Sequence, residues 1–249
     1  MSDLLVLCYH GISETWPAPT TVRPGDFEAQ LEHFLERGYR GATLTEALDL
    51  PPAEKTMVVS FDDAHRSVYE LAAPAMARLG VPGTVFVPTA YPDSGRPMGW
   101  EGYDVWLGTE HEPELACMGW EQLRELGGAG WEIGSHTKNH PRLSKIAPQP
   151  IKDELTESRR ECEEHMEAPC TSIAYPYSDY DDRAVRAAAE AGYRFAVTVP
   201  TGPAPALALQ WPRVGVYNGE SARRVALRAR ARRLEPHFAL QAMRRLRGR

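Results

Sequence analysis

The adjacent carboxylates Asp62 and Asp63 are the first residues whose types could do chemistry, and they directly follow the apolar run 56–61. Adjacent carboxylates repel each other, so a site that keeps both ionised usually supplies a cation. Hydrolysis needs one group that holds a metal and another that takes a proton from water. The pair could instead cap a helix that begins a few residues later, because acidic residues favour a first helical turn.

A second candidate is the pair His136 and His140, which follows the apolar run 131–135. Histidines four residues apart can bind one metal ion where the intervening backbone turns. Pro141 favours an extended conformation at His140, so a regular helix through both histidines is disfavoured. No glutamate lies between the two histidines, which excludes the metalloprotease HExxH helix.

Asp63, His136 and His140 together form a set of one carboxylate and two histidines that leaves coordination positions open for water and substrate. Such a set fits a hydrolytic metal site, and it also fits a non-haem iron oxygenase. In those oxygenases the carboxylate normally lies shortly after the first histidine, whereas Asp63 precedes both histidines here. The spare carboxylate of Asp62 is what hydrolysis requires, so we favour a hydrolase.

Two further groups lie at the ends of apolar runs. His10 follows the run 4–9, and an Ala-Tyr-Pro-Tyr segment occupies 174–177. Each has an ordinary structural interpretation: His10 could be a core histidine, and the segment 174–177 could be a turn with packed rings. The segment 174–177 could also form a rigid wall suited to a sugar. Both remain candidate functional groups, because the active-site residues of parallel α/β folds lie at the carboxyl ends of strands.

The elements that must position these residues alternate between two periodicities. Short apolar runs predict buried strands, and the amphipathic stretches between them predict helices, so repeated βα units and a parallel sheet follow. Residues 89–118 form a long excursion of the kind that is usually functional. We expect strands over 4–9, 56–61, 84–88, 131–135, 171–176, 194–199 and 211–217, and helices over 24–39, 66–80, 119–128, 152–165 and 182–191.

The composition and charge of the chain exclude some classes of function. The 249 residues carry a net charge of −6 and 43% hydrophobic residues, which is ordinary for a globular protein. Ten arginines gather from residue 223 onward, so the preceding part is strongly acidic and nucleic acid is not expected as a partner. No apolar run approaches the roughly 20 residues of a membrane span, and the start lacks a secretory signal. We therefore expect a cytoplasmic protein with its four cysteines reduced.

The sequence resembles the polysaccharide deacetylase family, carbohydrate esterase family four, over most of residues 4–217. Residues 60–64 (SFDDA) resemble its first motif, TFDDG, with Ala64 in place of glycine, and 136–140 match its second motif, H-[ST]-x-x-H. The segment 174–177 resembles its third motif, RxPY, without the arginine. The opening LCYHGI is similar to the start of cytosolic and exopolysaccharide-associated members, which often carry AYPY.

The resemblance implies an α/β fold, a distorted (β/α)7 barrel in a single domain. We expect the barrel over 1–219 and an arginine-rich helical C-terminal extension over 220–249. The implied activity is a metal-dependent hydrolase that removes an N-acetyl or N-formyl group from an amino sugar. The sugar could belong to a glycan, a glycoside or a lipid-linked saccharide. The alternative is a catalytically lapsed member that binds carbohydrate or a partner.

The resemblance also implies residue roles. Asp62 would be the general base, and the backbone N–H of Tyr177 would stabilise the oxyanion. The cation would be a divalent metal, foremost Zn²⁺, with Fe²⁺, Co²⁺ or Ni²⁺ as alternatives, held by Asp63, His136 and His140.

Two functional residues of the family have no direct match in this sequence. Arg213 is the best substitute for the arginine that is missing at Ala174. His10 is the candidate for the missing acid that protonates the leaving group, with His65 as second choice.

The basic C-terminal segment has two interpretations. Its arginines alternate with apolar residues, so a helix could dock its apolar face on the barrel. Alternatively, residues 222–249 could form a basic amphipathic helix that contacts anionic lipid at the inner membrane face. RNA binding is less favoured because the rest of the chain is acidic.

Overall fold

One parallel sheet organises the molecule. The structure, a computed structural model, describes residues 4–49, 54–202, 204 and 206–231. Its strands follow the order β8-β7-β6-β5-β4-β3-β1-β9, and β2 pairs with β3 beside this path. The strands are β1 Leu4–Tyr9, β2 Arg40–Ala42, β3 Thr56–Phe61, β4 Gly83–Val87, β5 Glu132–Ser135, β6 Ser172–Ala174, β7 Phe195–Thr198, β8 Trp211–Pro212 and β9 Val214–Gly215.

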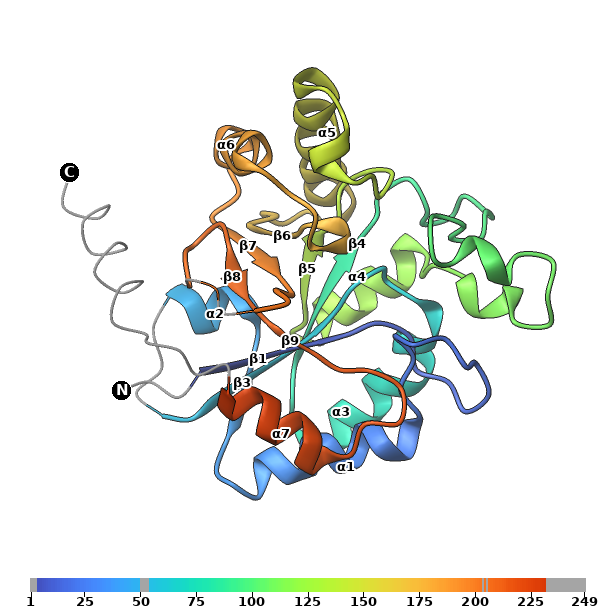
Figure 1. Ribbon diagram of the computed structural model, residues 1–249, viewed down its shortest axis with the longest axis vertical. Helices are drawn as coiled ribbons and strands as arrows, with labels where there is room; N and C mark the ends of the chain where they lie inside the picture. Colours follow the sequence, from blue (N-terminus) through green and yellow to red (C-terminus); the bar gives the residue numbers. More distant parts are fainter. Residues whose placement is uncertain (1–3, 50–53, 203, 205, 232–249) are drawn as a thin grey trace.

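The sheet curls into a nearly closed barrel with helices outside it (Figure 1). Every residue of β3 is buried, which explains why its sequence is a continuous apolar run. The single-domain (β/α) barrel expected from the sequence is confirmed. The helices are α1 Pro24–Leu35, α2 Leu44–Asp49, α3 Ala73–Leu79, α4 Trp120–Gly128, α5 Pro148–Met166, α6 Asp182–Ala191 and α7 Ala222–Ala231.

The expected strand over 211–217 is wrong as a single element. Arg213 interrupts it, and the two pieces lie at opposite ends of the sheet path. β8 pairs with β7, while β9 pairs with β1. The chain therefore closes the barrel at this point and turns the side chain of Arg213 into the interior, where it is 1% exposed.

The helix expected over 66–80 is present over 66–79, but it is not α-helical throughout. Val68–Ala72 forms a π-helical turn, and α3 starts only at Ala73. Pro74 follows this wider turn, which accommodates the proline without ending the helix. Gly80, with a φ of 66°, ends α3 in the left-handed conformation that glycine adopts at low cost.

β2 and α2 were not predicted, because three and six residues are too short for a periodicity to register. Their place is secured by Glu132 of β5. Its carboxylate accepts hydrogen bonds from the backbone N–H and the hydroxyl of Thr45, at 2.8 and 2.7 Å, and from the hydroxyl of Ser172 at 2.5 Å. Glu132 thus ties α2 to the amino-terminal ends of the central strands.

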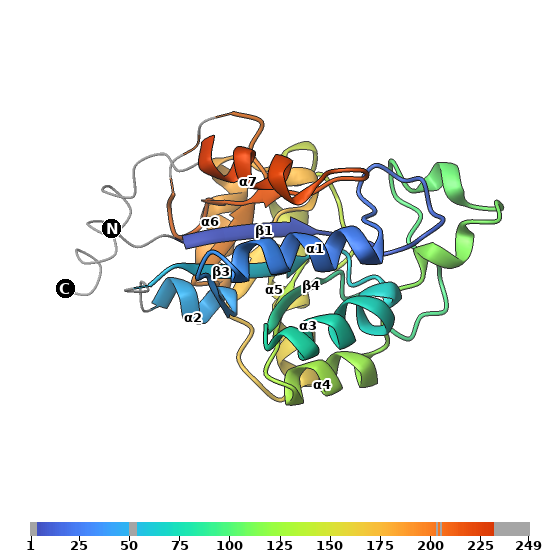
Figure 2. The same cartoon turned by 90° about the horizontal axis from the view of Figure 1, so that it is seen from below.

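The excursion after β4 projects from one side of the barrel (Figure 1). It contains the short 3₁₀ turns Asp104–Trp106 and Glu112–Leu115. At the other end of the chain, α7 lies beside α1 with Val225 buried (Figure 2). The remainder of the expected extension, from residue 232, lies outside the described residues. Within the described residues, no helix combines the length and the apolar character that a membrane span needs.

Candidate active site

The carboxyl ends of the barrel strands bring the candidate residues together. His10 follows β1, Asp62 and Asp63 follow β3, His136 follows β5, and Tyr177 lies just beyond β6. Because these strands are parallel and adjacent in one barrel, their carboxyl ends meet on one face. A catalytic constellation at this face is the usual arrangement in barrel enzymes.

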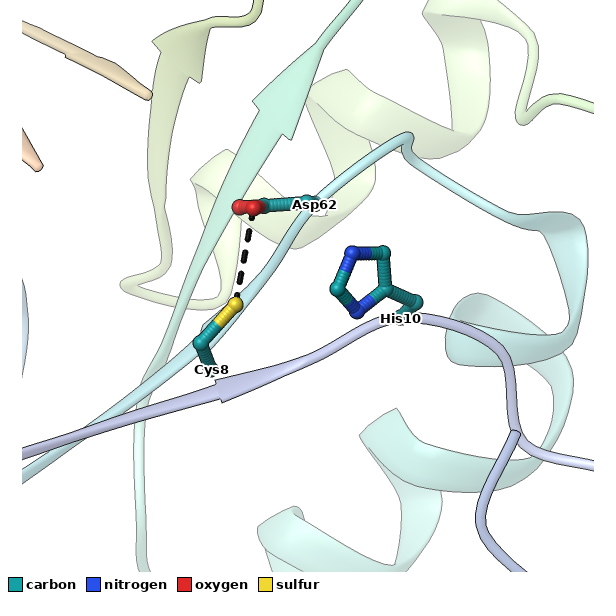
Figure 3. A group of neighbouring side chains, drawn as sticks. All are labelled: Cys8, His10 and Asp62. Atoms are coloured by element: carbon teal, nitrogen blue, oxygen red, sulfur yellow. Dashed lines mark hydrogen bonds between the residues drawn. The ribbon is translucent and has the colours of Figure 1, made fainter. Parts of the chain in front are cut away.

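Asp62 is held by a guanidinium. Arg213 donates two hydrogen bonds to its carboxylate, one to each oxygen, and both are 2.7 Å long. The thiol of Cys8 donates to Oδ2 of the same carboxylate at 3.4 Å (Figure 3). Burial alone would raise the pKa of Asp62, but the charges of Arg213 and His136 outweigh it and lower this pKa to about 2. Asp62 is therefore an ionised carboxylate in a fixed orientation.

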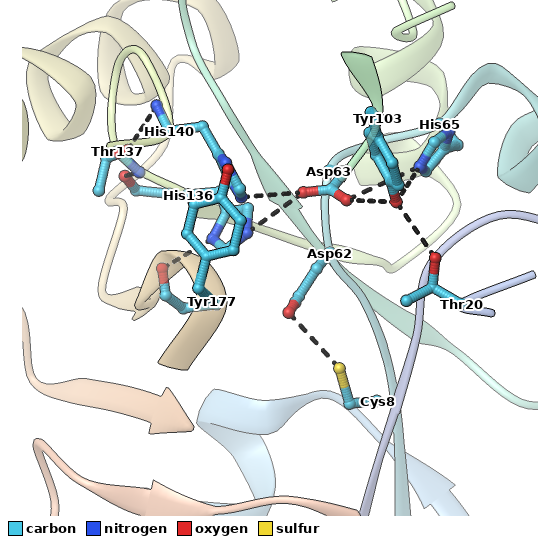
Figure 4. A network of polar contacts seen from close by, with 12 residues as sticks. Cys8, Thr20, Asp62, Asp63, His65, Tyr103, His136, Thr137, His140 and Tyr177 are labelled. Atoms are coloured by element: carbon cyan, nitrogen blue, oxygen red, sulfur yellow. Dashed lines mark hydrogen bonds and ion pairs between the residues drawn. The ribbon is translucent and has the colours of Figure 1, made fainter. Parts of the chain in front are cut away.

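Asp63 faces two imidazoles instead. Its Oδ1 lies 3.3 Å from Nε2 of His136 and 3.4 Å from Nε2 of His140 (Figure 4). This buried oxygen has no hydrogen-bond partner among the described residues. Ligand atoms about 2.0–2.1 Å from a tetrahedral metal lie about 3.3 Å apart, which is the separation seen here. The three side chains therefore fit one divalent cation.

The rings of the histidines are oriented for this purpose. Nδ1–H of His136 donates to the carbonyl of Ala174 at 2.7 Å, which leaves its Nε2 toward Asp63. His140 is covered by Trp100, whose ring stacks on it at 3.9 Å between centroids. Burial and the neighbouring His136 lower the pKa of His140 to about 3, so its ring is neutral as a metal ligand must be.

Tyr103, which comes from the excursion, was not predicted from the sequence. Its hydroxyl donates to Oδ2 of Asp63 at 2.9 Å and lies 3.0 Å from Nε2 of His65 (Figure 4). His65 in turn contacts the carbonyl of Glu114 through Nδ1 at 3.0 Å. Tyr103 thereby engages one oxygen of Asp63 and leaves the other facing the histidines. Only the aromatic richness of 89–118 hinted at such a residue.

Backbone strain is concentrated at this site. Eight non-glycine residues of the described chain have positive φ, and five of them belong to the segments that carry the site. Left-handed conformations cost roughly 1–3 kcal/mol each and persist where surrounding structure enforces them. Ala64 adopts a φ of 52° where the family motif has glycine, which explains why glycine suits this position. The five are Asp63, Ala64, Thr137, His140 and Tyr177.

Tyr177 and His10 border the metal-ligand set. The ring of Tyr177 lies 4.7 Å from that of His140, and the guanidinium of Arg142 lies over it at 4.0 Å. His10 is partly exposed, and its Nδ1 is buried without a hydrogen-bond partner in the described part of the chain. His65 is fully buried with both ring nitrogens engaged, so His10 is the better placed of the two candidate acids.

Known proteins with similar sequences identify the family of this chain. A family model for polysaccharide deacetylase matches residues 49–196. The chain belongs to the polysaccharide deacetylase family. It is 29% identical to the Bacillus subtilis (strain 168) protein YxkH over 208 residues, which cover 82% of this chain and 67% of YxkH. It is 23% identical over 188 residues to staphylococcal proteins named poly-beta-1,6-N-acetyl-D-glucosamine N-deacetylase, such as that of Staphylococcus aureus (strain N315).

The match with the staphylococcal deacetylase covers 70% of this chain and 60% of the staphylococcal protein. The chain therefore spans less than two thirds of that relative's length. Among solved structures it is similar to the Streptococcus pyogenes deacetylase PplD, with a TM-score of 0.76, 24% identity, and coverage of 90% of this chain and 96% of PplD. IcaB from Ammonifex degensii gives a TM-score of 0.75 at 24% identity, with coverage of 92% and 97%. These likenesses establish the fold of the family.

Proposed function

We propose that this protein is a metal-dependent hydrolase that removes an N-acetyl or N-formyl group from an amino sugar in a glycan, a glycoside or a lipid-linked saccharide. Family membership and the activity for which the staphylococcal relatives are named support the reaction class. The observation that carries the proposal is the unequal setting of two adjacent carboxylates. Asp62 is paired with Arg213, whereas Oδ1 of Asp63 faces two imidazole nitrogens.

The metal ligands in this proposal are Asp63, His136 and His140. A cation bound there would polarise the acyl carbonyl and acidify water, as Zn²⁺ does in metallohydrolases. Zn²⁺ is the proposed ion because the ligand separations match a tetrahedron, with Fe²⁺, Co²⁺ and Ni²⁺ as alternatives. Tyr103 and the carbonyl of Ala174 orient two of the three ligands from behind.

Four other residues serve the proton transfers and the developing charge. Asp62 takes a proton from the attacking water, and Arg213 keeps its carboxylate ionised and aimed. The backbone N–H of Tyr177 donates to the oxyanion that forms from the acyl carbonyl, a contribution typically worth about 2.7–4 kcal/mol. His10 gives a proton to the leaving amine, so that the sugar departs as a neutral amine and the acyl group as a carboxylic acid.

The test is release of acetate or formate from N-acylated amino sugars. We expect the purified protein with one equivalent of Zn²⁺ to release acetate from β-1,6- or β-1,4-linked N-acetylglucosamine oligomers or from a lipid-linked N-acetylated saccharide. The chelator-treated protein serves as the control. The lapsed-member alternative is motivated by Ala64 and Ala174, and it predicts binding of these ligands without release. Arg213 already supplies a guanidinium to Asp62, which weakens that motivation.

Replacing Arg213 should affect both stability and pH dependence. Arg213→Met is expected to lower the free energy of unfolding at pH 7 by about 3–5 kcal/mol, because Asp62 is left as a buried charge without its partner. Because the pKa of Asp62 is lower in the folded protein than the ordinary carboxyl pKa of 3.8, the pair stabilises the fold fully at pH values above 3.8. This stabilisation is lost as the pH falls from there toward about 2. In Arg213→Met the pKa of Asp62 rises, so the acidic limb of kcat/KM should move to higher pH.

Urea unfolding and a pH–rate profile measure these two effects of the Arg213 replacement. Arg213→Lys is the matched control, since it keeps a cation but loses the two-pronged contact, and it should lose less stability. A variant Arg213→Met with wild-type stability and an unshifted acidic limb would contradict the assigned role of the pair.

Removing the hydroxyl of Tyr103 should weaken metal binding. Tyr103→Phe is expected to reduce the affinity for Zn²⁺ by about 10–100-fold, because Asp63 loses the hydrogen bond that orients it. Competition with a chromophoric chelator measures this affinity without any substrate. Tyr91→Phe is the control, since Tyr91 belongs to the same excursion and packs its ring against Trp100. Equal affinities in both variants would remove Tyr103 as a positioning residue.

We also propose a cytoplasmic location with peripheral contact to anionic membrane through 222–249. In α7, Val225 is buried against the barrel while Leu227 is 70% exposed among arginines. Co-sedimentation with phosphatidylglycerol vesicles, against phosphatidylcholine vesicles, tests the contact. Truncation after Ala231 keeps the packed part of α7. Equal pelleting with both lipids, or by both forms of the chain, would rule the extension out as a membrane anchor.

A further inference from the structure

A second group of metal-binding residue types lies beside the first. Cys8, His10 and Asp62 each offer one ligand atom, and these atoms all lie within 4.8 Å of one another (Figure 3). The three come from the ends of the neighbouring strands β1 and β3. This cluster shares no residue with the set Asp63, His136 and His140, so it is a separate candidate site.

The spacing of the sulfur and the oxygen already suits a shared cation. Sγ of Cys8 lies 3.4 Å from Oδ2 of Asp62. A tetrahedral metal with bonds of about 2.3 Å to sulfur and about 2.0–2.2 Å to oxygen holds these two atoms about 3.5 Å apart. A cation could therefore replace the thiol hydrogen with little movement of either side chain.

The third member of the cluster, His10, has a ring nitrogen that is available to bind a metal. Nδ1 of His10 is buried and makes no hydrogen bond within the described residues. Cys8 is fully buried, and its other hydrogen bond is a long contact of 3.9 Å to the carbonyl of Tyr9. Neither group has a stronger interaction that a metal would have to break.

Arg213 limits the affinity of this cluster without closing it. Each carboxylate oxygen has two lone pairs, and Arg213 uses one on each oxygen of Asp62. The guanidinium can therefore keep both hydrogen bonds while Oδ2 accepts a metal. Its positive charge repels a second cation, whereas the ion-pair partners of Asp63 are imidazoles, which become neutral when they bind a metal. The cluster should fill only after the first site, when metal is in excess.

We infer that Cys8, His10 and Asp62 form an inhibitory site for a soft or borderline divalent cation such as Zn²⁺ or Cd²⁺. Binding breaks the S–H bond of Cys8, forms a sulfur–metal bond and releases the proton to solvent. An occupied site ties up Asp62 and His10 and so stops turnover, which rests on the function proposed above. Hard cations such as Mg²⁺ avoid thiolate ligands and should not inhibit.

Inhibition by excess metal is the first test. Wild-type protein loaded with one equivalent of Zn²⁺ should lose activity as Zn²⁺ or Cd²⁺ is raised, while Mg²⁺ has no effect. In Cys8→Ala the half-inhibiting Zn²⁺ concentration should rise at least about tenfold, because a ligand is missing. Cys162→Ala removes another fully buried thiol, from α5, and should behave as wild type. Equal inhibition of Cys8→Ala and wild type would overturn the inference.

A binding experiment separates this site from the proposed activity. Asp63→Ala removes the first site, so Co²⁺ added to this variant should bind at Cys8 and produce thiolate-to-cobalt charge-transfer absorption. The double variant Cys8→Ala with Asp63→Ala should lack that absorption. If wild-type protein hydrolyses no substrate but the absorption appears, the site stands and the proposed function fails. If no absorption appears and excess Zn²⁺ leaves an active enzyme uninhibited, the site fails alone.

Discussion

The Asp63→Ala variant is expected to bind its divalent cation at least about 100-fold more weakly than the wild-type protein, and to lose turnover with it. Asp63 supplies the only anionic ligand of the proposed set, and its Oδ1 is the atom that both imidazoles face, at 3.3 and 3.4 Å. Without it, His136 and His140 are two neutral ligands in a buried pocket. Elemental analysis after dialysis and an acetate-release assay measure the two losses together.

The matched control for this experiment is Asp179→Ala. Asp179 is a partly buried carboxylate that accepts hydrogen bonds from the backbone N–H and the hydroxyl of Ser144 and, among the described residues, belongs to no cluster of possible metal ligands. It should keep its metal, which separates loss of a ligand from loss of a carboxylate. Asp63→Ala protein with the metal content and turnover of wild type would end the proposal of a catalytic cation at this site.

Much of the fold could be predicted because its strands are long apolar runs. β1 and β3 each run for six residues through the barrel, and their limits match the expected ones. β2, α2 and the division at Arg213 could not be predicted. Their existence depends on pairing between distant segments, as between β9 and β1, rather than on local periodicity.

The residues of the site also differ in whether the sequence could predict them. Asp62, Asp63, His136 and His140 could be identified because a parallel sheet collects the residues that follow its strands. Contacts such as Tyr103 with Asp63 depend on how a long excursion folds back over 40 residues, which no local pattern specifies. The contact of Arg213 with Asp62, 151 residues apart, agrees with the expectation that Arg213 substitutes for the missing arginine, although the strand expected to carry it is divided at this residue.

The neighbouring aspartates thus receive different chemistry from their surroundings. Asp62 is paired with a guanidinium that remains charged at every accessible pH, so it stays ionised without a metal. Burial would raise the pKa of Asp63, but the neighbouring imidazoles of His136, His65 and His140 outweigh it and lower this pKa well below its usual range. One carboxylate is therefore available to move protons, and the other to hold a cation.

This division predicts that Asp62→Asn separates turnover from metal binding. The amide cannot take a proton from water, so kcat should fall by about 10²–10⁴-fold, the usual contribution of a general base. Metal content should remain near one equivalent, because Asp63, His136 and His140 are untouched. Steady-state kinetics and elemental analysis of the same preparation provide both readings.

The outcome of Asp62→Asn also tests the pairing with Arg213. The amide nitrogen of asparagine would face a guanidinium donor, so one of the two 2.7 Å hydrogen bonds must be lost. Asp62→Glu is the control, since it keeps a base but moves it, and it should retain more activity than the asparagine variant. Full activity in Asp62→Asn would assign proton transfer to another group, and loss of metal would mean that the two carboxylates act as one ligand set.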